Sequence, residues 1–192
     1  MIYIILSKII KKLKDEMKHR IRAAGLIIEK DCILLVLHRN DATGLQIWVP
    51  PGGGLTSADH SIFDTAKREI FEETGLTVQV HRISHIREFR DIINNIHHLE
   101  FFMPIESYSG TLSIKNVPNG DEDQPFIKEV RWIQKEDLRQ ITVYPEWLSS
   151  DLFWWEAKSN FPEMRYTEST FGTSKFMFGY KSKKIGSEIF ET

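Results

Sequence analysis

The segment that decides the interpretation reads Arg68-Glu69-Ile70-Phe71-Glu72-Glu73-Thr74-Gly75-Leu76. Its three glutamates stand at spacings that place all of their carboxylates on one face of a helix. Like charges so placed disfavour the helix by about 0.2–0.5 kcal/mol per pair, and a bound cation relieves that repulsion. Because Mg²⁺ and Mn²⁺ prefer oxygen ligands, the segment predicts a divalent-metal site. Arg68 is expected to pair with Glu72, four residues later.

Local signals on both sides predict that these glutamates lie on a helix over residues 61–74. Ser61 or Asp59 can cap its N-terminus, and Gly75 stands where a left-handed residue would end the helix. An apolar stripe recurs at four-residue spacing and would face a core: Ile62, Ala66 and Ile70. The glutamates therefore belong to an amphipathic helix.

A glycine-rich stretch comes shortly before this helix. Residues 47–49 predict a short apolar strand, which Pro50-Pro51 and Gly52-Gly53-Gly54 stop. Glycine backbone can approach a ligand without interference from a Cβ atom. Each feature alone has an ordinary explanation, a tight turn for the glycines and a solvated surface for the glutamates. Together, at this spacing, they favour a binding site.

The rest of the chain predicts an α/β fold, with a mixed β-sheet flanked by helices. Strands are expected at residues 21–29, 32–38, 78–89, 97–105, 111–114 and 127–133, and helices at residues 135–140 and 145–158. His97 and His98 are adjacent in one expected strand and point to opposite faces, so they are not expected to share a metal ion.

Length and composition indicate one compact domain, which we place at residues 17–163 of the 192. Residues 1–16 form an N-terminal extension expected to be peripheral, and residues 164–192 a C-terminal tail whose role the sequence leaves open. The net charge of −2 favours no nucleic-acid polymer as partner, and the short apolar run at residues 2–6 cannot span a membrane. The single cysteine, Cys32, favours a reducing, cytoplasmic location.

The glycines and the glutamate helix together resemble the Nudix box, G-x5-E-x7-R-E-U-x-E-E-x-G-U, where U is a bulky aliphatic residue. Residues 48–54 resemble the segment that leads into this box, and residues 131–138 a late strand and helix of the family. One position of this sequence, that of the first glutamate, departs from the box pattern. If the box begins at Gly54, its first glutamate falls at His60; if it begins at Gly53, that position is Asp59 and one residue is inserted. We prefer Asp59 because it keeps a carboxylate.

The resemblance implies a Nudix-type α/β/α sandwich and a metal-dependent hydrolase of a pyrophosphate bond in a nucleoside diphosphate linked to another moiety. It also implies Mg²⁺ or Mn²⁺ as cofactor and a small nucleotide or nucleotide-linked substrate. Carried over by position, the expected site residues are the catalytic Arg68, Glu69, Glu72 and Glu73, the metal ligands Gly54, Glu69, Glu72 and Glu73, and the substrate-binding Gly53, Gly54 and Trp48.

Four questions stay open in the sequence. The general base can come from the box, as Glu69 or Glu73, from the acidic loop, as Glu122, or from a strand, as Glu100. The second function compatible with the box is a non-catalytic Nudix-like nucleotide-binding or regulatory module. Neither the substrate nor the oligomeric state, with a homodimer as one alternative, follows from the sequence.

Overall fold

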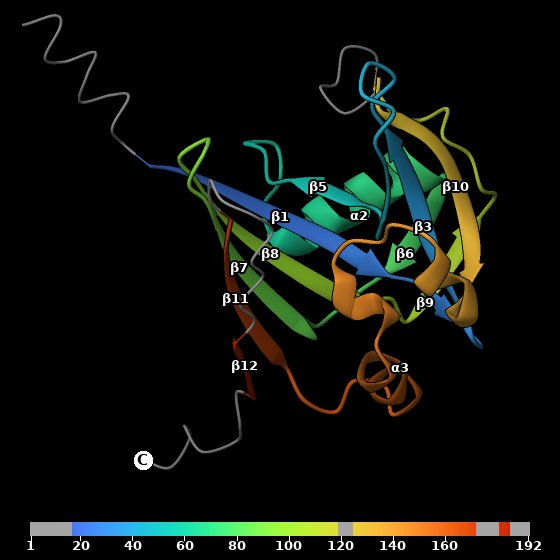
Figure 1. Ribbon diagram of the computed structural model, residues 1–192. Coiled ribbons are helices and arrows are strands. Elements are labelled where there is room, and N and C mark those ends of the chain that lie inside the picture. Colours follow the sequence, from blue (N-terminus) through green and yellow to red (C-terminus); the bar gives the residue numbers. More distant parts are fainter. Residues whose placement is uncertain (1–16, 119–124, 172–180, 185–192) are drawn as a thin grey trace, which may run out of the picture.

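The strands form three sheets in the computed structural model, which describes residues 17–118, 125–171 and 181–184 (Figure 1). The largest sheet has six strands, in the order β12 (Lys181–Lys184), β11 (Arg165–Phe171), β7 (His85–Asp91), β8 (Ile96–Pro104), β1 (Lys18–Leu26) and β5 (Gly52–Gly54). The β1–β8 and β7–β11 pairs are parallel, and the other pairs are antiparallel. This sheet is therefore mixed.

A second sheet of four strands holds β10 (Ile127–Gln134), β3 (Cys32–Arg39) and β2 (Ile28–Glu29), with β4 (Gln46–Val49) paired to β3. The strands β6 (Leu76–Gln79) and β9 (Ser107–Gly110) form the two-stranded sheet. The helical segments are α2 (Ile62–Thr74), the 3₁₀ helices η1 (Lys135–Gln140) and η2 (Glu146–Ser149), and α3 (Asp151–Lys158). The predicted α/β fold, a mixed sheet flanked by helices, is confirmed.

The strand β3 explains the layering, because its centre is apolar on both faces. Leu34 packs in one cluster with Ala66 and Ile70 of α2. Ile33 and Leu35 belong to a second cluster, which includes residues of η1, η2 and α3. Since successive strand side chains point to opposite faces, this apolar run is buried between two helical layers.

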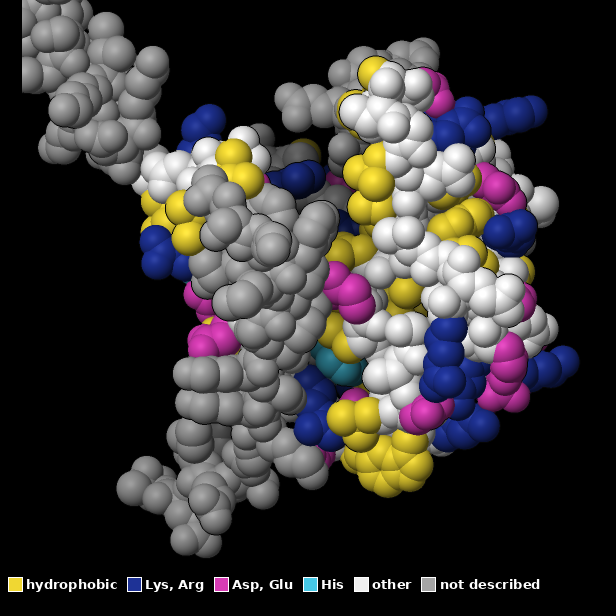
Figure 2. Space-filling model, in the orientation of Figure 1, with side chains coloured by type: hydrophobic (Ala, Val, Ile, Leu, Met, Phe, Trp, Pro, Cys, Tyr) yellow, Lys and Arg dark blue, Asp and Glu magenta, His cyan; other side chains and the backbone are white. Residues whose placement is uncertain are grey.

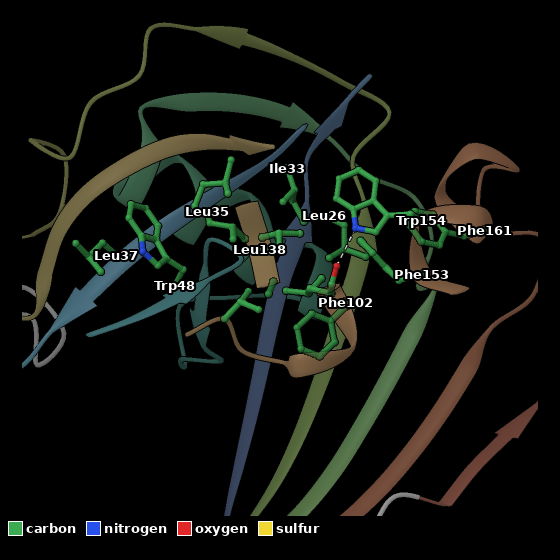
Figure 3. Packing of buried hydrophobic residues seen from close by; sticks show 14 residues of the cluster. Leu26, Ile33, Leu35, Leu37, Trp48, Phe102, Leu138, Phe153, Trp154 and Phe161 are labelled. Atoms are coloured by element: carbon green, nitrogen blue, oxygen red, sulfur yellow. Dashed lines mark hydrogen bonds between the residues drawn. The ribbon is translucent and has the colours of Figure 1, made fainter. Parts of the chain in front are cut away.

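The second cluster draws its bulk from aromatic side chains of the C-terminal half (Figure 3). Phe102, Phe153 and Trp154 lie in it together, each at most 2% exposed. The Trp154 Nε1–H donates to the carbonyl oxygen of Leu148 at 2.9 Å, which satisfies a buried polar group. Trp155, by contrast, is 61% exposed.

The helix α2 has the ends that its sequence predicts. The Ser61 hydroxyl accepts the backbone N–H of Asp64 at 3.2 Å, as expected of a residue that caps the N-terminus. Gly75 ends the helix in the left-handed region, with φ of +75°, and its N–H donates to the carbonyl of Phe71. These short-range signals place the glutamates on a helix, as expected.

Four predicted strands or helices differ from the structure. The strand expected at residues 21–29 is divided between β1, in the six-stranded sheet, and β2, in the four-stranded sheet. The strand expected at residues 78–89 is two strands, β6 and β7, because the chain passes from the two-stranded sheet to the six-stranded sheet between them. The strand expected at residues 111–114 is absent from these described residues, and β9 pairs with β6 just before it. The helix expected at residues 145–158 is interrupted at Ser150, whose extended backbone begins α3 and whose hydroxyl caps it.

Part of the C-terminal tail belongs to the largest sheet. Residues 165–171 form β11, which pairs in parallel with β7. The Arg165 guanidinium forms an ion pair with the buried Glu156 of α3. The division at residue 163 and the peripheral role of residues 1–16, which lie outside the described residues, stay predictions. No helix in the described part of the chain is both long and apolar enough to cross a membrane.

Candidate functional site

The three glutamates of α2 lie where this helix packs against β1 and β5. All are largely withdrawn from solvent: the side chains of Glu69, Glu72 and Glu73 are 15%, 18% and 4% exposed. The stretch Gly52–Gly54, expected as a turn, is the edge strand β5 and pairs with Arg22–Ala24 of β1. The helix and the glycine strand therefore lie against each other, and the site that the sequence predicts there stays a candidate.

The Arg68 guanidinium lies at the centre of this site. Its Nη1 donates to the carboxylates of Glu69 at 2.8 Å and Glu72 at 3.1 Å. Its Nη2 donates to the Gly54 carbonyl oxygen at 3.0 Å. The predicted Arg68–Glu72 pair is thus present, and three of the four groups expected to bind a metal, Glu69, Glu72 and the Gly54 carbonyl, converge on one positive charge.

Asp59 holds Arg68 from the other side. Both Asp59 carboxylate oxygens accept from the guanidinium, each at 2.9 Å, and the Thr56 backbone N–H donates to the same carboxylate. These hydrogen bonds hold the pKa of the Asp59 carboxyl well below its usual range. The geometry therefore gives Asp59, and not His60, the partnership with Arg68. Asp59 is not among the site residues expected from the sequence, although the preferred register of the box pointed to it.

Glu73 faces inward and is 3% exposed. Its Oε2 accepts the Gly52 N–H at 2.7 Å, and its Oε1 lies 3.7 Å from Nε2 of His38 on β3. That His38 nitrogen is buried with no hydrogen-bond partner among the described residues. His38 is a neighbour of the site that the sequence did not identify, because its strand shows only an apolar run.

Glu69 lies against the glycine strand. A Cβ atom on Gly53 would come within 2.4 Å of the Glu69 carboxyl carbon, so only glycine leaves room for this carboxylate. Burial raises the pKa of Glu69 to about 7, the positive Arg68 acts against this, and the negative Glu73 adds to it. Glu69 is therefore a carboxyl that can hold or release a proton near neutral pH.

These residues offer the donors that a hard divalent cation requires. Carboxylates of α2 and the Gly54 carbonyl already surround a cationic group, and Mg²⁺ and Mn²⁺ take oxygen ligands of this kind. With Arg68 among them, the described residues contain no group of three or more His, Cys, Asp or Glu side chains arranged to hold a metal ion. The donor set fits the cation provided that Arg68 gives up some of its contacts to the glutamates.

The other residues predicted for the site either lie elsewhere in the fold or fall outside the described residues. Trp48 is 6% exposed in the core, with the Arg131 guanidinium 4.8 Å from its ring centroid, so its contacts are those of a packing residue. Glu100 is 5% exposed on β8, and its Oε2 accepts from Arg87 at 3.0 Å. Glu122 lies outside the described residues. The contacts described here for Trp48 and Glu100 are with Arg131 and Arg87, not with the glutamates of α2.

Arg22 supports the glycine strand from β1. Its Nη2 donates to the carbonyl oxygens of Pro50 and Gly52, each at 2.9 Å. In the register of the sheet Arg22 lies beside Gly54 on one side and Glu100 on the other. The Arg22 side chain therefore links β1 to the backbone next to the site, a link that the sequence alone did not reveal.

The metal-free protein should lose stability, relative to a Glu69→Gln variant, as the pH rises. The pKa of Glu69 is about 7 in the fold against an ordinary 4.5, so its stabilising proton is fully present below pH 4.5 and lost through pH 7. We expect a loss of about 2 kcal/mol, since one pKa unit corresponds to about 1.4 kcal/mol and partial exposure reduces the total. Urea unfolding in EDTA at several pH values measures this; equal pH slopes for both proteins would contradict it.

Sequence and structure both resemble known proteins. Residues 18–151 match the NUDIX domain family. The human protein "Nucleoside diphosphate-linked moiety X motif 6" is 36% identical over 72 residues, which make up 36% of this chain and only 22% of the human protein. The fold is similar to that of a MutT protein from Bacillus halodurans, with a TM-score of 0.59, 21% identity, and coverage of 85% of this chain and 97% of the other. It is also similar to the ORF135 protein of E. coli, with a TM-score of 0.57, 18% identity, and coverage of 76% and 95%.

Proposed function

The chain belongs to the NUDIX domain family, and from this premise we propose that it is a metal-dependent pyrophosphohydrolase. Its substrate would be a nucleoside diphosphate linked to another moiety. The observation that supports this most is the convergence of the Glu69 and Glu72 carboxylates and the Gly54 carbonyl on one cationic group. A site that already gathers oxygens around a positive charge is suited to a cation that carries a diphosphate.

We propose a role for each site residue. Glu69, Glu72, Glu73 and the Gly54 carbonyl would hold Mg²⁺ or Mn²⁺. When bound, the cation neutralises charge on the diphosphate and lowers the pKa of a bound water. Glu69, whose carboxylate lies against Gly53 and accepts from Arg68, is the first candidate to orient the attacking water or accept its proton. Arg68, anchored by Asp59, would position the glutamates.

Several residues are candidates for the general base and for the contacts to the substrate. Glu73 is the second candidate within α2, but it already accepts the Gly52 N–H. Glu100 and Glu122 stay candidates from outside the helix. Glu100 already accepts a hydrogen bond from Arg87 and would have to act as a base in spite of this contact. Gly53 and Gly54 would contact a substrate through their backbone. Trp48, a buried residue of β4, would act only indirectly, by packing in the core.

A substrate panel tests the proposal. The protein is incubated with nucleotide sugars, dinucleotides and nucleoside diphosphates, each with Mg²⁺ or Mn²⁺, and released mononucleotide or phosphate is measured by chromatography. Reaction in ¹⁸O-labelled water then shows which phosphorus is attacked. Metal-dependent release supports the hydrolase. Tight nucleotide binding without turnover on any substrate would instead favour the non-catalytic, regulatory module.

Partners and location follow as proposals from the surface and composition. Among the described side chains on the face in Figure 2, acidic and basic groups lie beside one another rather than in a single basic field. With the net charge of −2, this supports a small-molecule substrate and no nucleic-acid polymer. A cytoplasmic location, the absence of a membrane partner and a homodimer stay predictions, the first of them supported by the single Cys32.

Gly53→Ala should impair turnover much more than it impairs stability. The three atoms nearest to an added Cβ all belong to the end of the Glu69 side chain, which can rotate away and would then leave its catalytic position. We expect kcat/KM to fall about 10²-fold or more, while Tm falls by only a few degrees, because a displacement of about 1 Å at a catalytic group is costly. Steady-state kinetics and thermal unfolding measure the two effects. Equal activity of the variant and the parent would contradict the placement of Glu69.

A further inference from the structure

A row of polar side chains crosses four neighbouring strands of the largest sheet, away from the proposed active site. The strands β1, β8, β7 and β11 supply His19, His97, Glu88 and Tyr166, in that order. His19 and His97 are direct partners in the parallel register of β1 and β8. His19 lies four residues before Ala23, the partner of Gly53, and is therefore about 13 Å along β1 from the glycine strand.

The two histidines face each other through the same kind of nitrogen. Nδ1 of His19 lies 3.2 Å from Nδ1 of His97, and the rings meet edge to face. Nε2 of His97 lies 2.5 Å from a carboxylate oxygen of Glu88. If Nε2–H of His97 donates to this carboxylate, Nδ1 of His97 carries a free lone pair aimed at His19.

We propose that His19 and His97 bind a transition-metal ion such as Zn²⁺ or Cu²⁺ through their Nδ1 atoms. Bonds of about 2.0–2.1 Å from zinc to histidine, at a tetrahedral angle, place two ligand nitrogens about 3.3 Å apart. The observed separation of 3.2 Å is close to this value. Small rotations of the rings aim both lone pairs at one ion, and neutral His19 needs only to move its proton from Nδ1 to Nε2.

Glu88 gives this pair the support that metal-binding histidines usually have. A carboxylate that accepts the second ring N–H fixes the tautomer and the orientation of the ligand. Glu88 is itself held in place, because its other oxygen accepts the Tyr166 hydroxyl at 2.7 Å. The neighbouring cation Arg90, in register with His97 on β7, donates to Met17 Sδ at 3.7 Å and is thus engaged with the methionine.

The histidine site differs in chemistry from the site on α2. It supplies two protein nitrogens, so water would complete the coordination. Imidazole suits Zn²⁺ and Cu²⁺, whereas the oxygen donors on α2 suit Mg²⁺ and Mn²⁺. Loss of one site should therefore leave the other intact. His98, next in sequence, stacks on Phe89 on the opposite face and does not join the pair.

Copper binding to the full chain, freed of any histidine tag, tests this proposal. One equivalent of Cu²⁺ is added, and electron paramagnetic resonance reports the nitrogens bound to it. The parent protein should show hyperfine coupling to two imidazole nitrogens. His19→Ala and His97→Ala should each lose this pattern and weaken Cu²⁺ affinity at least tenfold, and Glu88→Ala should weaken it about tenfold.

His81→Ala is the matched control, because it removes an exposed histidine that lies near Glu106 and outside the pair. Its spectrum and affinity should equal those of the parent. Circular dichroism checks the fold of each variant, and two independent histidine variants guard against the misfolding of one. The proposal is overturned if the parent binds no Cu²⁺ through nitrogen, or if both histidine variants bind as the parent does. Hydrolysis with Mg²⁺ is measured separately, so failure here would not bear on the proposed function.

Discussion

Glu72→Gln should lower kcat by about 10³-fold, with Tm within about 2 °C of that of the parent protein. Glutamine keeps the size of the side chain and one acceptor oxygen but removes the negative charge that a divalent cation requires. A loss of 10³-fold corresponds to about 4 kcal/mol of transition-state stabilisation. The fold should tolerate the change, because the substitution also relieves repulsion between Glu72 and Glu69 on one helix face.

The measurement is steady-state kinetics on the best substrate of the panel, at saturating Mg²⁺, together with thermal unfolding. Glu106→Gln is the matched control: it makes the same chemical change at a carboxylate that is 49% exposed and lies near His81. Its kcat should equal that of the parent. A Glu72→Gln variant with near-parent kcat would refute the assignment of this residue to the metal, whatever the panel shows for the family function.

The parts of the site that the sequence predicts are those fixed by short-range structure. At 3.6 residues per turn, the spacing of Glu69, Glu72 and Glu73 places them on one face of a helix. Ser61 and Gly75 fix the two ends of this helix through contacts with residues only three or four positions away. Such signals do not depend on the rest of the fold. The helix and its acidic face could therefore be placed from the sequence before any long-range contact was known.

The missing parts depend on contacts between distant segments. His38 comes to Glu73 only because β3 lies beside the helix, and Arg22 supports the glycine strand only through the pairing of β1 with β5. The pairing of β11 with β7 is of the same kind, since a polar segment such as residues 165–171 shows no strong apolar alternation. Strand pairing depends on tertiary context more than helix formation does, so these features were beyond local patterns.

Gly52→Ala should destabilise the protein by about 4 kcal/mol or more, the largest effect on stability that we expect. Gly52 has φ of +153°, a conformation that residues with a Cβ atom rarely adopt. An added Cβ would lie 2.2 Å from the Ala23 carbonyl oxygen and 2.4 Å from the Ala24 Cα. Both obstacles are backbone atoms of β1, which pairs with β8 on its other side, so neither can move without breaking the β1–β5 pairing.

The loss should appear as a Tm lower by about 10 °C, since 1 kcal/mol corresponds to about 2–4 °C in a domain of this size. Activity should fall with it, because the Gly52 N–H is the group that holds Glu73. Gly54→Ala is the matched control, two residues along the same strand, where an added Cβ would meet no described atom within 4 Å. Its Tm should stay within about 2 °C of the parent. Equal Tm values for both variants would mean that β5 does not lie against β1 as described. The positions assigned to Glu69 and Glu73 next to β5 would then also be wrong.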